Sequence, residues 1–298
     1  MGHALVSRLL SAGHDVAVYN RTREKALDLV ELGATLVDTV ADLADRDIVF
    51  TMVADSTDVE AVVEALLSRP HVQPGLIVDS TTISPAAGES IRRRAAARGT
   101  AMLAAPVSGN PKVAASGRLT IVTSGPIEAW TQARPYLEPL CRKVTYVGDG
   151  ERARLVKVCH NLMLGVVAQC MAEISVLAEQ GGVSRADLWE FMNDSVMGSV
   201  FTRYKTPAYV NLDFRPTFTP SLLLKDFHLG FEAARASGVP MPVVAAAEQA
   251  VQLLEGMKGN DVDFAALIEL VAAGAGVELV PADVEIDDGL APLESVVG

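Results

Sequence analysis

The stretch GHALVSRLLSAGHDVAVYNRT, residues 2–22, decides how the fold begins. Its first half has apolar residues at helical spacing and predicts a helix, whereas DVAVYN at residues 15–20 predicts a buried strand. A glycine directly before such a helix–strand pair fits the last glycine of a G-x-G-x-x-G turn, which lets the helix pack close to its sheet. We therefore expect Gly2 to be that glycine, with the first strand and the first two glycines absent from the sequence. Met1 would then be an internal methionine or mark a truncation; the alternative is a fold that simply begins with a helix.

Short apolar runs alternate with helical patterns as far as Gly148. Two helical patterns lie at residues 22–33 and 56–69, between the earlier runs. Unbroken Val- and Ile-rich strands that alternate with helices predict a mostly parallel sheet covered on both faces. The further strand candidates are residues 47–54, 75–82, 101–108, 119–125 and 144–148.

After Gly150 the strand signals stop. RARLVKVCHNLMLGVVAQCMAEISVLAEQGG, residues 152–182, is a long helical pattern that ends in a glycine pair, as a helix C-cap would. The prediction is an α/β Rossmann-type parallel sheet, N-terminally truncated, in residues 1–149. It is followed by an all-helical domain in residues 150–273, with a long interdomain helix, and by a loosely attached acidic tail in residues 274–298.

Charge and composition exclude several classes of protein. The net charge of −12 makes a nucleic acid an improbable partner, although six acidic residues from Glu278 onward account for much of it. The three cysteines have no metal or disulfide spacing, no two histidines have metal-ligand spacing, and Cys159 and Cys170 are expected in the core. We find no apolar run of about 18 residues and no signal-peptide pattern, and expect a cytoplasmic enzyme without membrane contact or bound metal.

The second strand of the predicted sheet ends at Asn20, Arg21 and Thr22. An acidic residue here would bind the ribose hydroxyls of NAD, whereas an arginine accommodates the 2′-phosphate of NADP. Arg21, flanked by amide and hydroxyl donors, therefore favours NADPH over NAD. The alternative is a solvated turn in which Thr22 caps the following helix; Thr22 could serve both purposes.

Four further motifs occur in a recognisable order. They are VDSTTISP (78–85), APVSGNPKVAASG (105–117), KVCHN (157–161) and KDFHLGFEAARASGVPMP (225–242). Together they resemble the β-hydroxyacid dehydrogenase family, which includes 3-hydroxyisobutyrate, tartronate-semialdehyde and 6-phosphogluconate dehydrogenases. The resemblance spans roughly residues 1–273. It implies an NAD(P)-dependent enzyme that interconverts a small 3-hydroxy acid and its semialdehyde.

Lys157 and Asn161 are four residues apart and share one face of the long predicted helix. A buried ammonium has its pKa lowered toward neutrality, which suits a proton donor in carbonyl reduction. The resemblance implies that Lys157 is the proton donor or acceptor and that Asn161 holds the substrate. His160 lies between them in sequence and is expected to face another direction.

The remaining site residues also follow from the resemblance. It implies that Ser108 and Gly109 grip the substrate carboxylate, although Asn110 departs from the family's second glycine. Lys225 would reach the cofactor or the substrate carboxylate, and Asp226 would anchor its helix on the cofactor side. The other expected cofactor contacts are Val53, Ala54 and Thr82.

Two other functions remain open. One is a non-catalytic dinucleotide-binding or scaffold homologue, which the missing first strand favours and the retained Lys157 and Asn161 oppose. The other is an imine reductase, which Lys157 makes less favoured. The long helix is apolar nearly all round and must be buried on several sides, so we expect a homodimer or a higher homo-oligomer.

Overall fold

The computed structural model describes residues 1–290, which form two compact units. The first comprises Met1–Lys157, and the second begins at Val158. The strands are β1 (Ala17–Val18), β2 (Thr35–Leu36), β3 (Ile48–Thr51), β4 (Leu76–Asp79), β5 (Ala101–Ala104), β6 (Val107–Ser108), β7 (Thr120–Thr123) and β8 (Lys143–Tyr146). The helices of the first unit are α1 (Gly2–Ser11), η1 (Arg23–Ala26), α2 (Leu27–Glu31), η2 (Val40–Leu43), α3 (Ser56–Leu66), α4 (Pro85–Ala96), α5 (Pro111–Ala115), α6 (Ile127–Leu137) and η3 (Glu138–Leu140).

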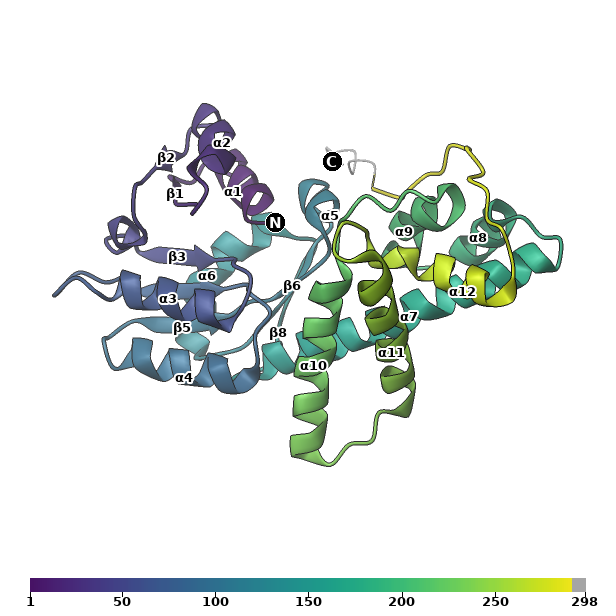
Figure 1. Ribbon diagram of the computed structural model, residues 1–298. Coiled ribbons are helices and arrows are strands. Elements are labelled where there is room, and N and C mark those ends of the chain that lie inside the picture. Colours follow the sequence, from purple (N-terminus) through teal and green to yellow (C-terminus); the bar gives the residue numbers. More distant parts are fainter. Residues whose placement is uncertain (291–298) are drawn as a thin grey trace. The chain divides into compact units, whose positions relative to one another are not determined.

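The first unit has the predicted α/β architecture (Figure 1). Its strands lie in the orders β2–β1, β3–β4–β5 and β6–β7–β8. All of these pairs are parallel except β6–β7, and an antiparallel bridge between Ala104 and Ser124 links β5 to the end of β7. Each expected apolar run contains a strand. Only β2, two residues long, was not expected from the sequence.

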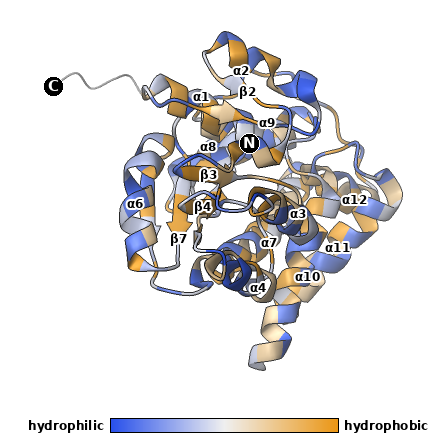
Figure 2. Ribbon diagram, turned by 90° about the vertical axis from the view of Figure 1, so that its left-hand side faces the viewer, coloured by the Kyte–Doolittle hydropathy of each residue, from blue (hydrophilic) through white to orange (hydrophobic). Residues whose placement is uncertain are grey.

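The core of the first unit explains why these runs form strands. All four residues of β4 are buried, so this central strand has no face for solvent and is apolar until Asp79. In Figure 2 β3, β4 and β7 are mostly hydrophobic, whereas α4 and α6 carry more hydrophilic residues. Helices α3 and α4 contribute Val59, Val63, Leu66, Ile91 and Ala95 to the cluster against these strands. The sheet is therefore held by apolar burial, as the pattern predicts.

A gap separates β1 from β3. Among the described strands β1 pairs only with β2, and β3 only with β4. Both line a cavity of about 450 Å³ that α1 also borders. A Cβ added at Gly2 would lie 4.0 Å from Met52, just after β3, and Asp15 pairs with Arg46, just before β3, at 2.8 Å. Helix α1 therefore runs antiparallel to β3 and borders this cavity.

The second unit is helical. It contains α8 (Arg185–Asp194), α9 (Val200–Asn211), α10 (Pro220–Ser237), α11 (Pro242–Lys258), η4 (Phe264–Ala266) and α12 (Leu267–Ala275), together with α7 (Arg152–Gln180) from Val158 onward. As predicted, α7 ends at a glycine pair, with Gly182 at φ +80°. Leu223 and Phe227 of α10 and Val251 and Leu254 of α11 are completely buried in the core that these helices share with α7.

Helix α7 corrects the expectation that the chain has no long apolar run. By length and composition it could cross a membrane, with a mean hydropathy of 1.6 over its most apolar window. Its side chains nevertheless supply much of the second unit's core, including Val158, Leu162, Met171 and Val176. A core helix passes the same test as a membrane-spanning one, and 44% of the most apolar window of α7 is buried inside the protein.

The start of the acidic tail is also better attached than expected. Arg185 donates to the Val280 carbonyl at 2.6 Å, and Asn211 exchanges two hydrogen bonds with the backbone of Val284. Leu290 is buried. The described part of the tail therefore packs along α8 and α9; residues 291–298 of the expected tail lie outside the described residues.

Candidate active site

The turn after β1 places Asn20, Arg21 and Thr22 in solvent. The side-chain Oδ1 of Asn20 accepts a hydrogen bond from the Thr22 N–H at 3.0 Å, which shapes the turn. The Arg21 side chain is 86% exposed and lies 3.8 Å from the Asp58 carboxylate, too exposed for strong pairing. Thr22 occupies the N-cap position of η1 but makes no side-chain capping bond, so the alternative in which Thr22 caps the following helix is not borne out. The turn thus presents a guanidinium that an anion can approach.

The turns after β3 and β4 are joined by hydrogen bonds. The Val53 N–H donates to the Thr81 hydroxyl at 3.1 Å, and Thr81 itself is buried. Thr82 is partly exposed, as is Val53, and it follows Thr81 directly. Thr81 therefore has a structural role, which leaves Thr82 as the residue of this pair that a ligand can reach. These turns follow the carboxyl ends of parallel strands, where doubly wound sheets bind ligands.

Ser108 ends β6, and the chain turns sharply at Gly109, whose φ of +132° strongly favours glycine. An added Cβ would also lie 2.6 Å from Leu119 and 2.7 Å from Val113. Asn110 has a clear purpose: its side-chain oxygen accepts from the Val113 N–H at 3.0 Å and caps α5. The departure from a second glycine therefore gives a capped helical turn directly after the candidate carboxylate-binding residues.

Lys157 and Asn161 both lie on α7, one helical turn apart. Lys157 is partly buried, and Asn161 is 3% exposed. The Asn161 amide donates to the Asp226 carboxylate at 2.5 Å, and its oxygen lies 2.8 Å from Nδ1 of His160. The prediction that His160 faces elsewhere is wrong, because its ring reaches along the helix to this amide. Asn161 is thus held from two sides.

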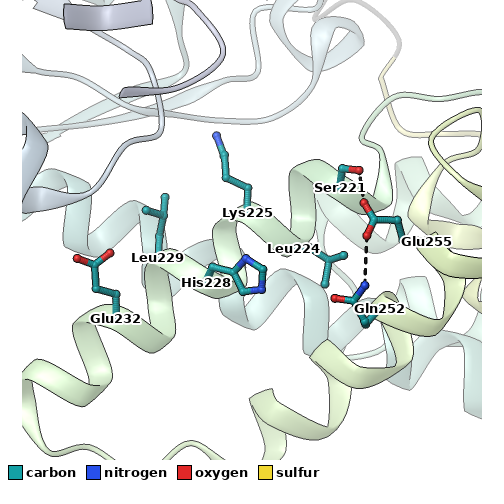
Figure 3. A pocket seen from close by; sticks show the side chains of 8 residues that line it. All are labelled: Ser221, Leu224, Lys225, His228, Leu229, Glu232, Gln252 and Glu255. Atoms are coloured by element: carbon teal, nitrogen blue, oxygen red, sulfur yellow. Dashed lines mark hydrogen bonds between the residues drawn. The ribbon is translucent and has the colours of Figure 1, made fainter. Parts of the chain in front are cut away.

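Lys225 and Asp226 lie on α10. Asp226 is 2% exposed and connects α10 to α7 through Asn161, as a helix anchor would. The Lys225 amine lies 3.7 Å from the Asp226 carboxylate. In Figure 3 it extends away from Ser221, Gln252 and Glu255, which are hydrogen-bonded to one another across a pocket between α10 and α11. Lys225 is therefore directed away from the polar side of that pocket.

The cysteines and carboxylates give no sign of a metal centre. The described residues contain no cluster of three or more His, Cys, Asp or Glu side chains that could hold a metal ion. Cys159 and Cys170 are exposed on α7, so the expectation that they lie in the core is wrong. Cys141 is half-buried, and burial raises the pKa of its thiol to about 11. None of the three has a hydrogen-bonded arrangement typical of a nucleophile.

The comparisons with known proteins agree with this geometry. Residues 1–148 match the model of the NAD-binding domain of 6-phosphogluconate dehydrogenase, and residues 151–271 match that of the NAD-binding domain of NADP-dependent 3-hydroxyisobutyrate dehydrogenase. L-threonate dehydrogenase of Cupriavidus necator is 31% identical, over 94% of this chain and 94% of its own length. The 3-hydroxyisobutyrate dehydrogenase of Pseudomonas aeruginosa is also 31% identical, over 85% of this chain and 88% of its own length.

The chain belongs to the β-hydroxyacid dehydrogenase family. A solved structure of the Mycobacterium tuberculosis 3-hydroxyisobutyrate dehydrogenase with L-serine is 28% identical, with a TM-score of 0.78 over 91% of this chain and 95% of that one. The protein is accordingly an NAD(P)-dependent hydroxyacid dehydrogenase. This family assignment confirms the resemblance drawn from the four sequence motifs.

Proposed function

We propose that this β-hydroxyacid dehydrogenase interconverts a small 3-hydroxy acid and its semialdehyde with NADP(H) as the preferred cofactor, and that Lys157 is its proton donor and acceptor. The observation that carries the proposal is the pairing on α7: a partly buried lysine one turn before an asparagine held by Asp226 and His160. The retained lysine opposes both the scaffold and the imine reductase alternatives. Residues 1–149 would bind the cofactor.

The residues at the strand ends fit a nicotinamide dinucleotide. Gly2 begins a ten-residue helix beside Met52, and a helix N-terminus favours the negative charge of a pyrophosphate. The exposed Arg21 and the Thr22 hydroxyl suit a 2′-phosphate, and the turns at Val53, Ala54 and Thr82 suit the rest of the cofactor. A cofactor held by these residues would supply or accept the hydride of the reaction.

The side chains proposed to contact the substrate have separate roles. Ser108 and the backbone of Gly109 would bind the carboxylate of the hydroxy acid, with Lys225 as an additional cation. Lys157 would give a proton from Nζ to the carbonyl oxygen during reduction and take it back during oxidation. Asn161 would orient the same oxygen by its amide, which Asp226 and His160 hold in one orientation.

The experiment is a steady-state assay over a panel of small acids. Oxidation of 3-hydroxyisobutyrate, L-threonate and L-serine is followed with NADP⁺ and NAD⁺, and reduction of tartronate semialdehyde with NADPH and NADH. We expect Lys157→Met to lower kcat about 10²- to 10⁴-fold, the range for general acid–base catalysis. The matched control is Lys143→Met, an exposed lysine on β8. A Lys157→Met variant with kcat within threefold of the wild type would exclude the proposed role.

The cofactor preference is tested at Arg21. Because a hydrogen bond to a charged group contributes about 1.5–3 kcal/mol, Arg21→Ala should raise the KM for NADPH about 10- to 150-fold. The KM for NADH should change less than threefold. Arg134→Ala, an exposed arginine on α6, is the control. An equal effect of Arg21→Ala on both cofactors would contradict the NADP preference.

We also propose that the protein is at least a homodimer, formed through the helical unit. Its described surface exposes several large apolar side chains on and around α7 and α8, a feature that marks interfaces. They include Met163, Leu177, Phe191, Val196 and Met197. Light scattering of the wild type should give twice the chain mass or more, and Phe191→Glu should shift it toward the monomer. A monomeric wild type at micromolar concentration would refute this.

A further inference from the structure

A buried arginine at the start of α7 is unexplained by the mechanism so far. Arg154 is 2% exposed, and its guanidinium lies 2.7 Å from the Asp79 carboxylate and 2.7 Å from that of Glu151. It also donates to the Thr81 carbonyl at 3.1 Å. Arg92, on α4, reaches the other oxygen of Glu151 at 2.9 Å. A charged cluster is thus built into the first unit where β4, α4 and α7 meet.

Asp79 connects this cluster to both cofactor-side turns. Its second oxygen accepts from the Thr51 hydroxyl at 2.6 Å and from the Thr81 N–H at 3.2 Å. Thr81 in turn accepts from Val53. Through one carboxylate, therefore, the ends of β3 and β4 are joined by hydrogen bonds and are linked to the first turn of α7 by an ion pair.

The helix α4 leaves room for this guanidinium. A Cβ added at Gly88 would lie 2.3 Å from Nε of Arg154 and 2.5 Å from the Glu151 carboxylate. Such distances are far shorter than van der Waals contact, so any side chain at position 88 would enter the space that Arg154 occupies. Three elements distant in sequence thus accommodate one arginine.

Stability is a poor explanation for the cluster. A buried ion pair loses so much hydration that well-packed apolar residues of the same volume are often as stabilising or more so. What the cluster does supply is a defined geometry, because a planar guanidinium holds several acceptors in fixed positions. Arg154 lies three residues before Lys157, on an adjacent position of the same helix.

We propose that Arg154 is a positioning residue, which through Asp79 and Glu151 fixes Lys157 at the start of α7 relative to the Thr81–Thr82 turn. The inference rests on the proposed role of Lys157 and extends it. Lys157 would contact the substrate and Thr82 the cofactor during one hydride transfer, so the position of one relative to the other affects the rate. A displacement of about 1 Å in such a site can cost about 100-fold in rate.

Two variants test the proposal. Arg154→Lys keeps the charge but loses the fork of donors, and Gly88→Ala pushes the guanidinium aside without removing any charge. Both should lower kcat about 10- to 100-fold and raise the KM for NADPH by a smaller factor, because Arg21, on the separate turn after β1, would still bind the cofactor. The controls are Arg98→Lys, which alters an arginine bound to the Leu67 carbonyl, and Gly256→Ala, where an added Cβ meets nothing within 4 Å.

A second readout does not depend on activity. Amide hydrogen exchange should accelerate in residues 79–84 and 151–158 together in both variants, and remain unchanged there in the controls. Variants that lose thermal stability but keep the wild-type kcat and exchange would show that Arg154 is only structural and would overturn the proposal. If the wild type turns over no acid of the panel but the two variants still accelerate exchange in both segments, the proposed function fails. The structural link between residues 79–84 and 151–158 then still holds. If Arg154→Lys does not fold, Gly88→Ala decides alone.

Discussion

Replacing Asp263 by asparagine should destabilise the helical unit strongly. Asp263 is 1% exposed and pairs with Lys205, itself 4% exposed, at 2.5 Å. It also accepts hydrogen bonds from the backbone N–H groups of Thr217, Phe218 and Ala265, between 3.0 and 3.1 Å. One carboxylate therefore neutralises a buried ammonium and anchors both the segment before α10 and the start of η4.

The magnitude follows from that burial. Asparagine has nearly the same shape, but it has no charge, and its NH₂ group would face a donor. Removing one partner of a buried ion pair costs about 3–5 kcal/mol, because the remaining charge stays buried. For a unit of this size, about 1 kcal/mol lowers Tm by roughly 3–5 °C, so Asp263→Asn should lower it by about 10–20 °C.

The matched control is Glu269→Gln in the same unit. Glu269 pairs with Lys258 at 3.1 Å, but both side chains are more than a third exposed. Such a surface pair contributes about 0–1 kcal/mol. Both variants should be followed by circular dichroism during thermal and urea unfolding. Equal losses in the two variants, or a loss below about 1 kcal/mol for Asp263→Asn, would refute the reasoning from burial.

Two further predictions concern other positions. Gly230→Ala should lower the free energy of unfolding in urea by about 1–2 kcal/mol, because its Cβ would lie 2.5 Å from Leu162. Gly256→Ala should raise it by about 0.5–1 kcal/mol through helix propensity alone. A gain in both variants would contradict the tight α7–α10 contact. Iodoacetamide at pH 8 should modify Cys141 about 100-fold more slowly than a thiol of pKa 9, since burial raises its pKa to about 11, and the rate should rise about tenfold per pH unit. Mass spectrometry gives the rate, with exposed Cys159 as internal reference, and equal rates would exclude the raised pKa.

The local patterns of the sequence were sufficient for the architecture. Unbroken apolar runs such as the one that forms β4 indicate strands buried on both faces, because they leave no position for a polar, solvent-facing side chain. The spacing of Lys157 and Asn161 likewise placed them on one helix face, since helical geometry depends only on separation along the chain. The same spacing could not give the orientation of His160, which depends on its rotamer.

Contacts between residues far apart in sequence were decided by the tertiary structure. Asn161 and Asp226 are 65 residues apart, and Arg154 and Thr81 are 73 apart. Nothing near Arg154 indicates burial, because a lone arginine in a helical pattern is usually solvated; only the space at Gly88 and the carboxylate of Asp79 make its position tolerable. The sequence by itself thus determined the fold class, the strands other than β2 and the candidate lysine. The fold decided which polar groups are buried together, because that depends on the packing of elements that no local pattern contains.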